Sequence, residues 1–130
     1  MIKLRLEDNP RRMLSYLHEW KYPFPWTAEE IAASIVLRGD NGDDTVGFIW
    51  FAPQDVASGV WSFHITVSPH YRGRWLSRAG IKKFHVMCEI LNIKTLMIEH
   101  YLPVTKAIAH MLGAEEVSEN LSFLDIEREG

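Results

Sequence analysis

An arginine-rich segment between a predicted strand and a predicted helix holds the residues best suited to chemistry. The strand ends near Val67 and Pro69, and the run Arg72-Gly73-Arg74 then leads into a helix with Arg78 close to its start. Backbone N–H groups at a helix N-terminus lack intrahelical partners, and the helix dipole adds about half a positive charge there. The segment therefore predicts a site for a phosphate or a diphosphate. The alternative is an ordinary strand-to-helix turn with solvated arginines.

Composition and charge limit what the ligand of that segment can be. The chain has 130 residues, of which 47% are hydrophobic and 24% are charged. These values are typical of one globular domain with a single sizeable core and argue against disorder. Because the formal net charge is −3, the chain as a whole does not attract nucleic acid or an anionic membrane. The arginines are a local feature, which favours a small phosphorylated ligand.

Several classes of protein are disfavoured by what the sequence lacks. Cys88 is the only cysteine, so an intramolecular disulfide cannot form, and we expect a small buried hydrophobe. The sequence shows no secretory signal pattern and no apolar run near the ~20 residues of a membrane span. No histidine, cysteine or carboxylate spacing typical of metal sites occurs. We expect a soluble cytoplasmic protein with no metal, no membrane partner and no nucleic-acid partner.

Hydrophobic periodicity predicts an α+β fold in one domain over residues 1–130. Predicted strands cover 2–7, 34–38, 45–51, 60–67, 95–100, 116–118 and 121–127, and predicted helices cover 10–20, 28–33, 75–91 and 103–112. The strands at 34–38 and 45–51 are expected to form a hairpin across 39–44. The final strand, ending near Glu127, is expected to be an edge that could pair with a second copy of the chain.

Local signals place the ends of several elements. Asp8 or Asn9 is expected to cap the first helix, and Thr27 with Glu30 forms a capping box for the second. Gly113 is expected to terminate the last helix. In the strand at 60–67, alternation puts two sets of side chains on opposite faces. One set is Trp61, Phe63, Ile65 and Val67, and the other is Ser62, His64 and Thr66.

This order of elements resembles the GNAT superfamily of N-acetyltransferases. In that family a strand ending in V-x-P leads into an R-x-x-G-x-G/A loop around the diphosphate of acetyl-coenzyme A. The residues standing in that pattern here are Val67, Pro69, Tyr71, Arg72, Gly73, Arg74 and Ala79. A second similar segment runs from Ile98 to Ala114, with Leu112-Gly113-Ala114 in the place of the family's LGF element. The resemblance implies a mixed, mostly antiparallel, twisted sheet of six to seven strands flanked by about four helices.

The resemblance also implies acetyl-coenzyme A as co-substrate. The residues it assigns to binding are Thr66, Val67, Arg72, Gly73, Arg74, Trp75, Leu76, Ser77 and Arg78. Two loop glycines of the family fall on Trp75 and Ser77, where a side chain can obstruct the approach of the diphosphate. The tyrosine that many members use as general acid falls on Ala109. The neighbouring His110 lies about 100° around the helix from that position.

The same resemblance points to two catalytic candidates. The family's base is commonly on the strand that corresponds to 60–67, where His64 is the ionisable candidate, and a histidine pKa near neutrality suits that role. The alternative is a cross-strand packing residue with a satisfied hydrogen bond. Glu99, followed by His100, is the second candidate, at the end of the neighbouring strand. The alternative for both is a solvated strand end.

An aromatic cluster falls where the family's first two helices flank the acceptor groove. Its members are Trp20, Tyr22, Phe24 and Trp26. The prolines at 23 and 25 exclude a helix there. The rings could form the wall of an acceptor site, or they could seal the core beneath an irregular loop.

Two functions follow from the sequence. The first is an acyl-coenzyme A-dependent N-acyltransferase that moves an acetyl group from acetyl-coenzyme A to the amine of an unknown acceptor by direct attack. The second is a catalytically inactive GNAT-fold binding or assembly component, of phage or other origin, motivated by Trp75 and Ala109. Monomer and homodimer are both open.

Overall fold

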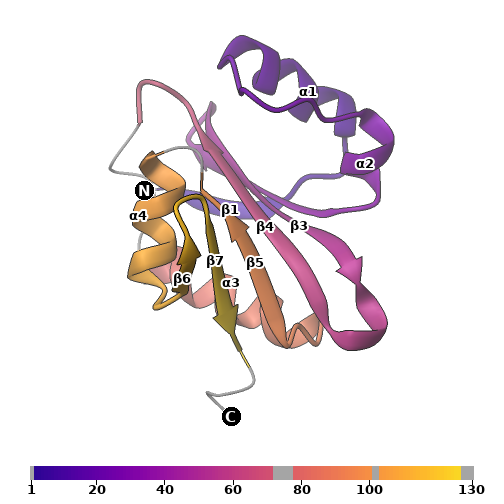
Figure 1. The fold of residues 1–130 in the computed structure, drawn as a ribbon. Helices are drawn as coiled ribbons and strands as arrows, with labels where there is room; N and C mark the ends of the chain where they lie inside the picture. The colour runs from indigo at the N-terminus through magenta and orange to yellow at the C-terminus, as the bar shows by residue number, and fades with distance from the viewer. Residues whose placement is uncertain (1, 72–77, 101–102, 127–130) are drawn as a thin grey trace.

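In the part of the chain that the structure describes, seven strands form one sheet with helices on both of its faces (Figure 1). The structure is a computed structural model that describes residues 2–71, 78–100 and 103–126. In chain order the elements are β1 (Lys3–Leu6), α1 (Pro10–Glu19), α2 (Ala28–Ala32), β2 (Ile35–Asn41), β3 (Asp44–Asp55), a 3₁₀ turn (Val56–Ser58), β4 (Val60–Val67), α3 (Arg78–Ile90), β5 (Thr95–Glu99), α4 (Pro103–Met111), β6 (Glu115–Ser118) and β7 (Leu121–Asp125). None of the described helices is both long enough and apolar enough to cross a membrane.

The strand order is β1-β2-β3-β4-β5-β7-β6. β4 and β5 run parallel, whereas the other neighbouring pairs in the described sheet are antiparallel. The parallel pair requires a crossover, which α3 supplies between the two strands. This arrangement confirms the predicted α+β class and the mixed, mostly antiparallel sheet.

The sheet separates two hydrophobic cores. On one face α3 and α4 bury Phe84, Cys88 and Ile108 against strand residues that include Phe63 and Ile98. On the other face the residues that pack together come from α1, α2, β2 and β3, namely Met13, Leu17, Trp20, Ile31, Val36, Phe48 and Trp50. The predicted alternation of β4 is confirmed, because its odd-numbered residues belong to the α3–α4 core. Ser62, His64 and Thr66 therefore face α1 and α2.

The predicted helix ends are confirmed where the structure describes them. The side chain of Asn9 accepts hydrogen bonds from the amides of Arg11 and Arg12 at the start of α1. Thr27 and Glu30 form both bonds of the capping box of α2, and Gly113 ends α4 with φ +82°. The predicted start of the third helix at Trp75 lies outside the described residues.

Three expectations were wrong in detail. The β2–β3 hairpin has a two-residue loop, Gly42–Asp43, because both strands extend to the pair Asn41–Asp44. In the strand predicted over 2–7, the alternation of Ile2, Leu4 and Leu6 with charged residues predicted an inward-facing Leu6, but this residue is 66% exposed. The final strand β7 lies inside the sheet between β5 and β6, so the short strand β6, not β7, is an edge beside which another chain could pair.

An ion-pair network fixes the start of α1 to β1 and β2. The Glu7 carboxylate, which is almost fully buried, lies 3.2 Å from Arg38 and 3.4 Å from Arg12. Arg38 also binds Asp40 at 3.0 Å, and Arg5 binds the same carboxylate at 3.1 Å. Burial alone would lower the pKa of Arg38, but its bonds to Asp40 and Glu7 outweigh this and raise it. The network therefore holds α1, and the loop that follows it, at a fixed place over the sheet.

Candidate active site

The site begins where β4 and β5 part. Their parallel pairing runs from Val60–Thr95 to Phe63–Ile98. β4 then continues to Val67 while it remains paired with β3, so it extends well past the tip of β5 (Figure 1). β5 instead follows β7, because Glu99 pairs with Leu121 and the amide of His100 donates to Asn120 O. The edge of β4 beyond Phe63 is thus open toward β5.

The two predicted catalytic residues are the first ones beyond this last pair. If the register continued by one position, His64 would stand opposite Glu99 on the face covered by α1 and α2. Both residues line one cavity of about 260 Å³. The described residues that line it are Tyr22, Phe24, Pro25, Trp26, Glu30, Gln54, Ser62, His64 and Glu99. The structure therefore brings together both candidates, from two strands, with the loop after α1.

His64 is a neutral, tightly held ring. Its Nε2 lies 2.8 Å from Ser62 Oγ, to which Gln54 Nε2 also donates at 3.1 Å. The imidazole stacks on Trp50 at 5.3 Å between ring centroids and meets Trp26 edge-on at 4.8 Å. Burial among these groups disfavours the charged ring and lowers the pKa of His64 from 6.5 to about 4. The pKa near neutrality expected from the sequence is therefore not found.

The aromatic loop both lines the cavity and seals the core. Tyr22, Phe24 and Trp26 line the cavity together, with Pro25 beside them. Tyr22 and Trp26 also pack edge-on against Trp50, with centroid distances of 5.6 and 5.4 Å. Trp20 differs from the other three, because it is buried against Phe48 in the core below α1.

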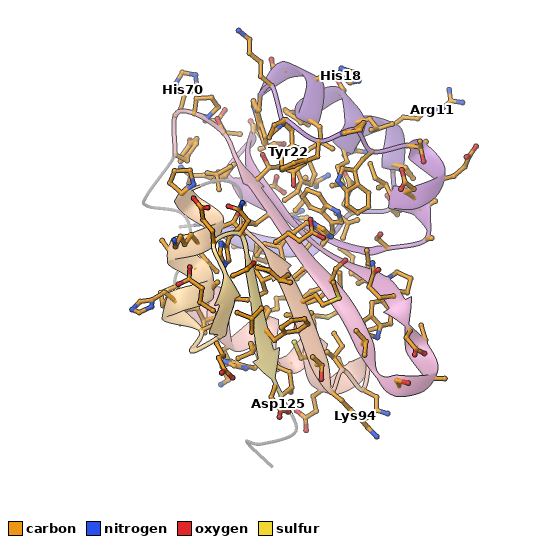
Figure 2. The ribbon with its side chains drawn as sticks, viewed as in Figure 1. Arg11, His18, Tyr22, His70, Lys94 and Asp125 are labelled. Carbon is orange, nitrogen blue, oxygen red and sulfur yellow. The ribbon has the colours of Figure 1, made fainter. Side chains whose placement is uncertain are left out.

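Tyr22, a member of the aromatic cluster that was expected to form an acceptor wall or to seal the core, also carries a hydroxyl group for which no role was predicted. The ring lies between α1 and the sheet, at the opposite end of the molecule from Lys94 and Asp125 (Figure 2). Burial, and after it the carboxylate of Glu99, raise the pKa of Tyr22 to about 12. The phenol keeps its proton at neutral pH and can donate a hydrogen bond in the cavity. No local pattern could have predicted this, because the burial of Tyr22 and its interaction with Glu99 depend on the tertiary fold.

The predicted cofactor-binding residues are only partly described. Thr66 and Val67 are buried in β4, at the open edge. Arg78 begins α3. The predicted residues Arg72, Gly73, Arg74, Trp75, Leu76 and Ser77 lie outside the described residues.

The chain that enters this loop is fixed just before it. The Tyr71 hydroxyl donates to Asp44 Oδ2 at 3.0 Å and accepts from Asn41 Nδ2 at 3.4 Å. The Tyr71 amide donates to Ser68 O, and the Ser68 amide donates to Val46 O. The β2–β3 hairpin thus holds the entry to the predicted diphosphate loop. His70 marks this end of β4 in Figure 2.

His100 and Glu99 face opposite sides of the sheet. His100 is 3% exposed and faces α4, and its Nε2 lies 2.7 Å from Ser122 Oγ. With His110 it lines a different cavity on the α4 side of the sheet. Ala109, in the place of the family's tyrosine, is buried in the α3–α4 core. Among the described residues, no group of three or more histidine, cysteine or acidic side chains is placed to hold a metal ion.

Sequence comparison alone identifies no relative. The chain matches no protein-family model, and no curated protein sequence matches it either.

Solved structures of similar shape cover nearly the whole chain. The spermidine/spermine N-acetyltransferase SpeG from Vibrio cholerae is 15% identical, with a TM-score of 0.71 over 98% of this chain and 94% of that one. A Desulfovibrio desulfuricans protein assigned to the GNAT family of acetyltransferases is 16% identical, with a TM-score of 0.66 over 97% and 99% of the two chains. The Salmonella typhimurium protein yncA, described with its cofactor acetyl-CoA, is 14% identical, with a TM-score of 0.69 over 96% and 94%. The chain therefore has the fold of the GNAT acetyltransferases.

Proposed function

We propose that the protein is an acyl-coenzyme A-dependent N-acyltransferase that moves an acetyl group from acetyl-coenzyme A to a primary amine. The observation that supports this most is the position of His64 and Glu99. Both line one cavity at the point where β4 and β5 part, in a fold shared with acetyltransferases. The SpeG neighbours act on spermidine, and from them we carry over only the reaction type, acetylation of an amine.

The reaction needs no covalent enzyme intermediate. The lone pair of a neutral amine attacks the thioester carbonyl carbon, a C–N bond forms, and the C–S bond then breaks to release coenzyme A as a thiolate. The new ammonium centre loses one proton, which leaves an amide. The protein must hold both substrates in line, supply an N–H for the carbonyl oxygen and accept that proton.

The environments of the two candidates give them different roles. His64 is held by Ser62 and by two tryptophan rings, and the burial that lowers its pKa to about 4 disfavours the imidazolium that proton acceptance would form. Glu99 is exposed at the end of β5, so it can take a proton from the amine and pass it to water. We therefore assign proton acceptance to Glu99. His64 serves as a neutral hydrogen-bonding wall that fixes the position of the acceptor.

The open edge of β4 suits the coenzyme arm. Beyond Phe63 the strand is paired with β3 and not with β5, so backbone groups near Thr66 and Val67 are available to the amides of a pantetheine chain. The resemblance places the diphosphate at residues 72–77, beyond Tyr71. With Ala109 where the family has its tyrosine, the thiolate leaves without a proton from that residue. A thiol with a pKa near 8.5 tolerates this.

A non-catalytic binding component with this fold is the second candidate. The observation in its favour is Ala109, which is 2% exposed in the core and offers no acid to the leaving group. Such a component could bind coenzyme A thioesters without turning them over.

The two candidates are separated by a turnover assay. Acetyl-coenzyme A is incubated with the protein and a panel of primary amines, and free thiol and the mass of the acetylated amine are both recorded. We expect both products to appear together, and we expect the double variant R72A/R74A to lose them through weaker diphosphate binding. Binding of acetyl-coenzyme A without turnover of any amine would favour the non-catalytic component. Neither binding nor turnover would overturn the proposal.

A further inference from the structure

The cavity lined by His64 and Glu99, which we call the acceptor cavity, has an excess of negative charge. Among its described lining residues, the carboxylates of Glu30 and Glu99 carry formal charge, and none is a lysine or an arginine. His64 is neutral and Tyr22 is protonated at neutral pH. Neither carboxylate forms an ion pair with a described residue. The cavity therefore presents a negative potential, which attracts a cation and repels a carboxylate.

The rest of the wall is aromatic and suits the same kind of ligand. The side chains of Tyr22, Phe24 and Trp26 line it together. The faces of such rings attract ammonium groups, most strongly when the cation is partly removed from water. The rings also pack against methylene groups. An ammonium on a short aliphatic chain satisfies both the charge and the apolar surface of this cavity.

The chemistry of acetyl transfer favours a ligand with more than one amino group in such a cavity. The attacking nitrogen must be neutral, yet a neighbouring carboxylate stabilises the ammonium form of an amine and raises its pKa. Two carboxylates around a single amine would hold it in its unreactive state. A ligand with two amino groups reduces this conflict, because Glu30 can hold one nitrogen as an ammonium while the other loses its proton to solvent, attacks as a neutral amine and passes the proton released after the attack to Glu99.

This inference rests on the proposed function. We propose that the acceptor is a small diamine-type cation and that Glu30 binds the ammonium group that does not react. Glu30 lies on α2, whereas Glu99 lies at the opening between β4 and β5, so the two carboxylates come to the cavity from different elements. The capping bond of α2 uses Glu30 Oε1 and leaves the other oxygen to a ligand. The cavity of about 260 Å³ is below the usual ~300–1,000 Å³ of small-molecule sites, so the chain between the two amino groups is short.

A series of matched acceptors tests this directly. The acceptors are 1,4-diaminobutane, 1-aminopentane, 4-amino-1-butanol and 4-aminobutanoate, which share a reacting primary amine and differ at the far end in being cationic, apolar, neutral polar or anionic. The measurement is kcat/KM for each with saturating acetyl-coenzyme A. We expect the diamine to exceed the apolar and hydroxyl acceptors about tenfold and the carboxylate acceptor by more, and we expect 0.5 M salt to reduce these ratios.

Two variants link the selectivity to Glu30. Glutamine is also found at this position of capping boxes, so E30Q removes the charge while it keeps the cap of α2. We expect E30Q to bring the diamine within about threefold of 4-amino-1-butanol, because the charge that distinguishes the two far ends is removed. E29Q makes the same change one residue earlier, at an exposed side chain that does not line the cavity, and it should keep the wild-type ratios.

The outcomes separate this inference from the function on which it rests. Turnover in which 4-aminobutanoate equals or exceeds the diamine, or in which E30Q keeps the wild-type ratios, would overturn the diamine assignment and leave acyl transfer standing. If no acceptor reacts, saturation-transfer NMR measures whether 1,4-diaminobutane and 4-aminobutanoate bind, and so tests the proposed cation site without turnover. Binding of the diamine that E30Q weakens would support the site, and equal or absent binding of the two ligands would overturn it.

Discussion

The burial of His64 between two tryptophans predicts a stability that depends on pH in a defined direction. In the unfolded chain the histidine pKa is 6.5, and in the folded protein it is about 4. Between these values the unfolded state binds more protons than the folded state, so the free energy of unfolding falls as the pH falls. A tenfold change in proton affinity corresponds to about 1.4 kcal/mol, so the full effect is about 3 kcal/mol. About 2 kcal/mol of it is lost between pH 7 and pH 5.

The assay is urea unfolding of the wild type and of H64Q at pH 7 and at pH 5. Glutamine keeps a hydrogen-bonding group beside Ser62 but cannot take up the proton. We expect H64Q to be less stable than the wild type at pH 7, because it loses ring packing, and to lose about 2 kcal/mol less than the wild type on acidification. H18Q, the same substitution on the exposed side of α1, controls for the removal of one histidine.

Two results would refute this reasoning. One is an equal loss of stability in the wild type and in H64Q between pH 7 and pH 5. The other is an NMR titration in which the ring signal absent from H64Q moves with a pKa of about 6 to 7, the range of an unperturbed histidine. Either result would mean that the ring is open to water, and the neutral wall assigned to the acceptor cavity would then be wrong.

Further predictions concern the framework around the site. R38A removes the arginine that Glu7 and Asp40 share and leaves them only the more exposed Arg12 and Arg5. It should lower the free energy of unfolding by up to about 3 kcal/mol, whereas R5A, at a side chain 56% exposed, should cost less than about 1 kcal/mol; urea unfolding measures both. Gly113 has φ +82° and no neighbouring atom within 4 Å of the place that a Cβ would take, so G113A should cost about 1 kcal/mol of backbone strain. G59A, with φ +72° and the Lys94 side chain 2.8 Å from the added Cβ, should cost more in the same assay. Cys88 is fully buried, so dithiobis-nitrobenzoate should react with it in urea and not in buffer, and a fast reaction of the native protein would contradict the packing of α3.

Local features of the fold could be predicted from the sequence because short-range chemistry determines them. The Asn9 cap, the capping box of Thr27 with Glu30 and the two faces of β4 depend on residues within a few positions of each other. The hairpin loop was predicted too long, because Asp40 and Asn41 suggested a turn. In the structure Asp40 has arginine partners and Asn41 binds Tyr71, so both remain in the strand.

The site depended on long-range pairing that local patterns do not encode. His64 and Glu99 line one cavity because the parallel register of β4 and β5 ends one residue before each of them. The low pKa of His64 depends on Trp26 and Trp50, which come from a loop and from another strand. The resemblance of residues 67–79 to a cofactor loop indicated that the site lies at the ends of β4 and β5. It could not indicate the charge of the cavity that the two strands help to line.

Binding of acetyl-coenzyme A, measured by titration calorimetry, tests the central claim most directly. The account predicts one saturable site per chain, with a dissociation constant in the micromolar range or below, and a loss of that heat in R72A/R74A. No heat of binding at millimolar acetyl-coenzyme A, together with no change in melting temperature, would contradict it.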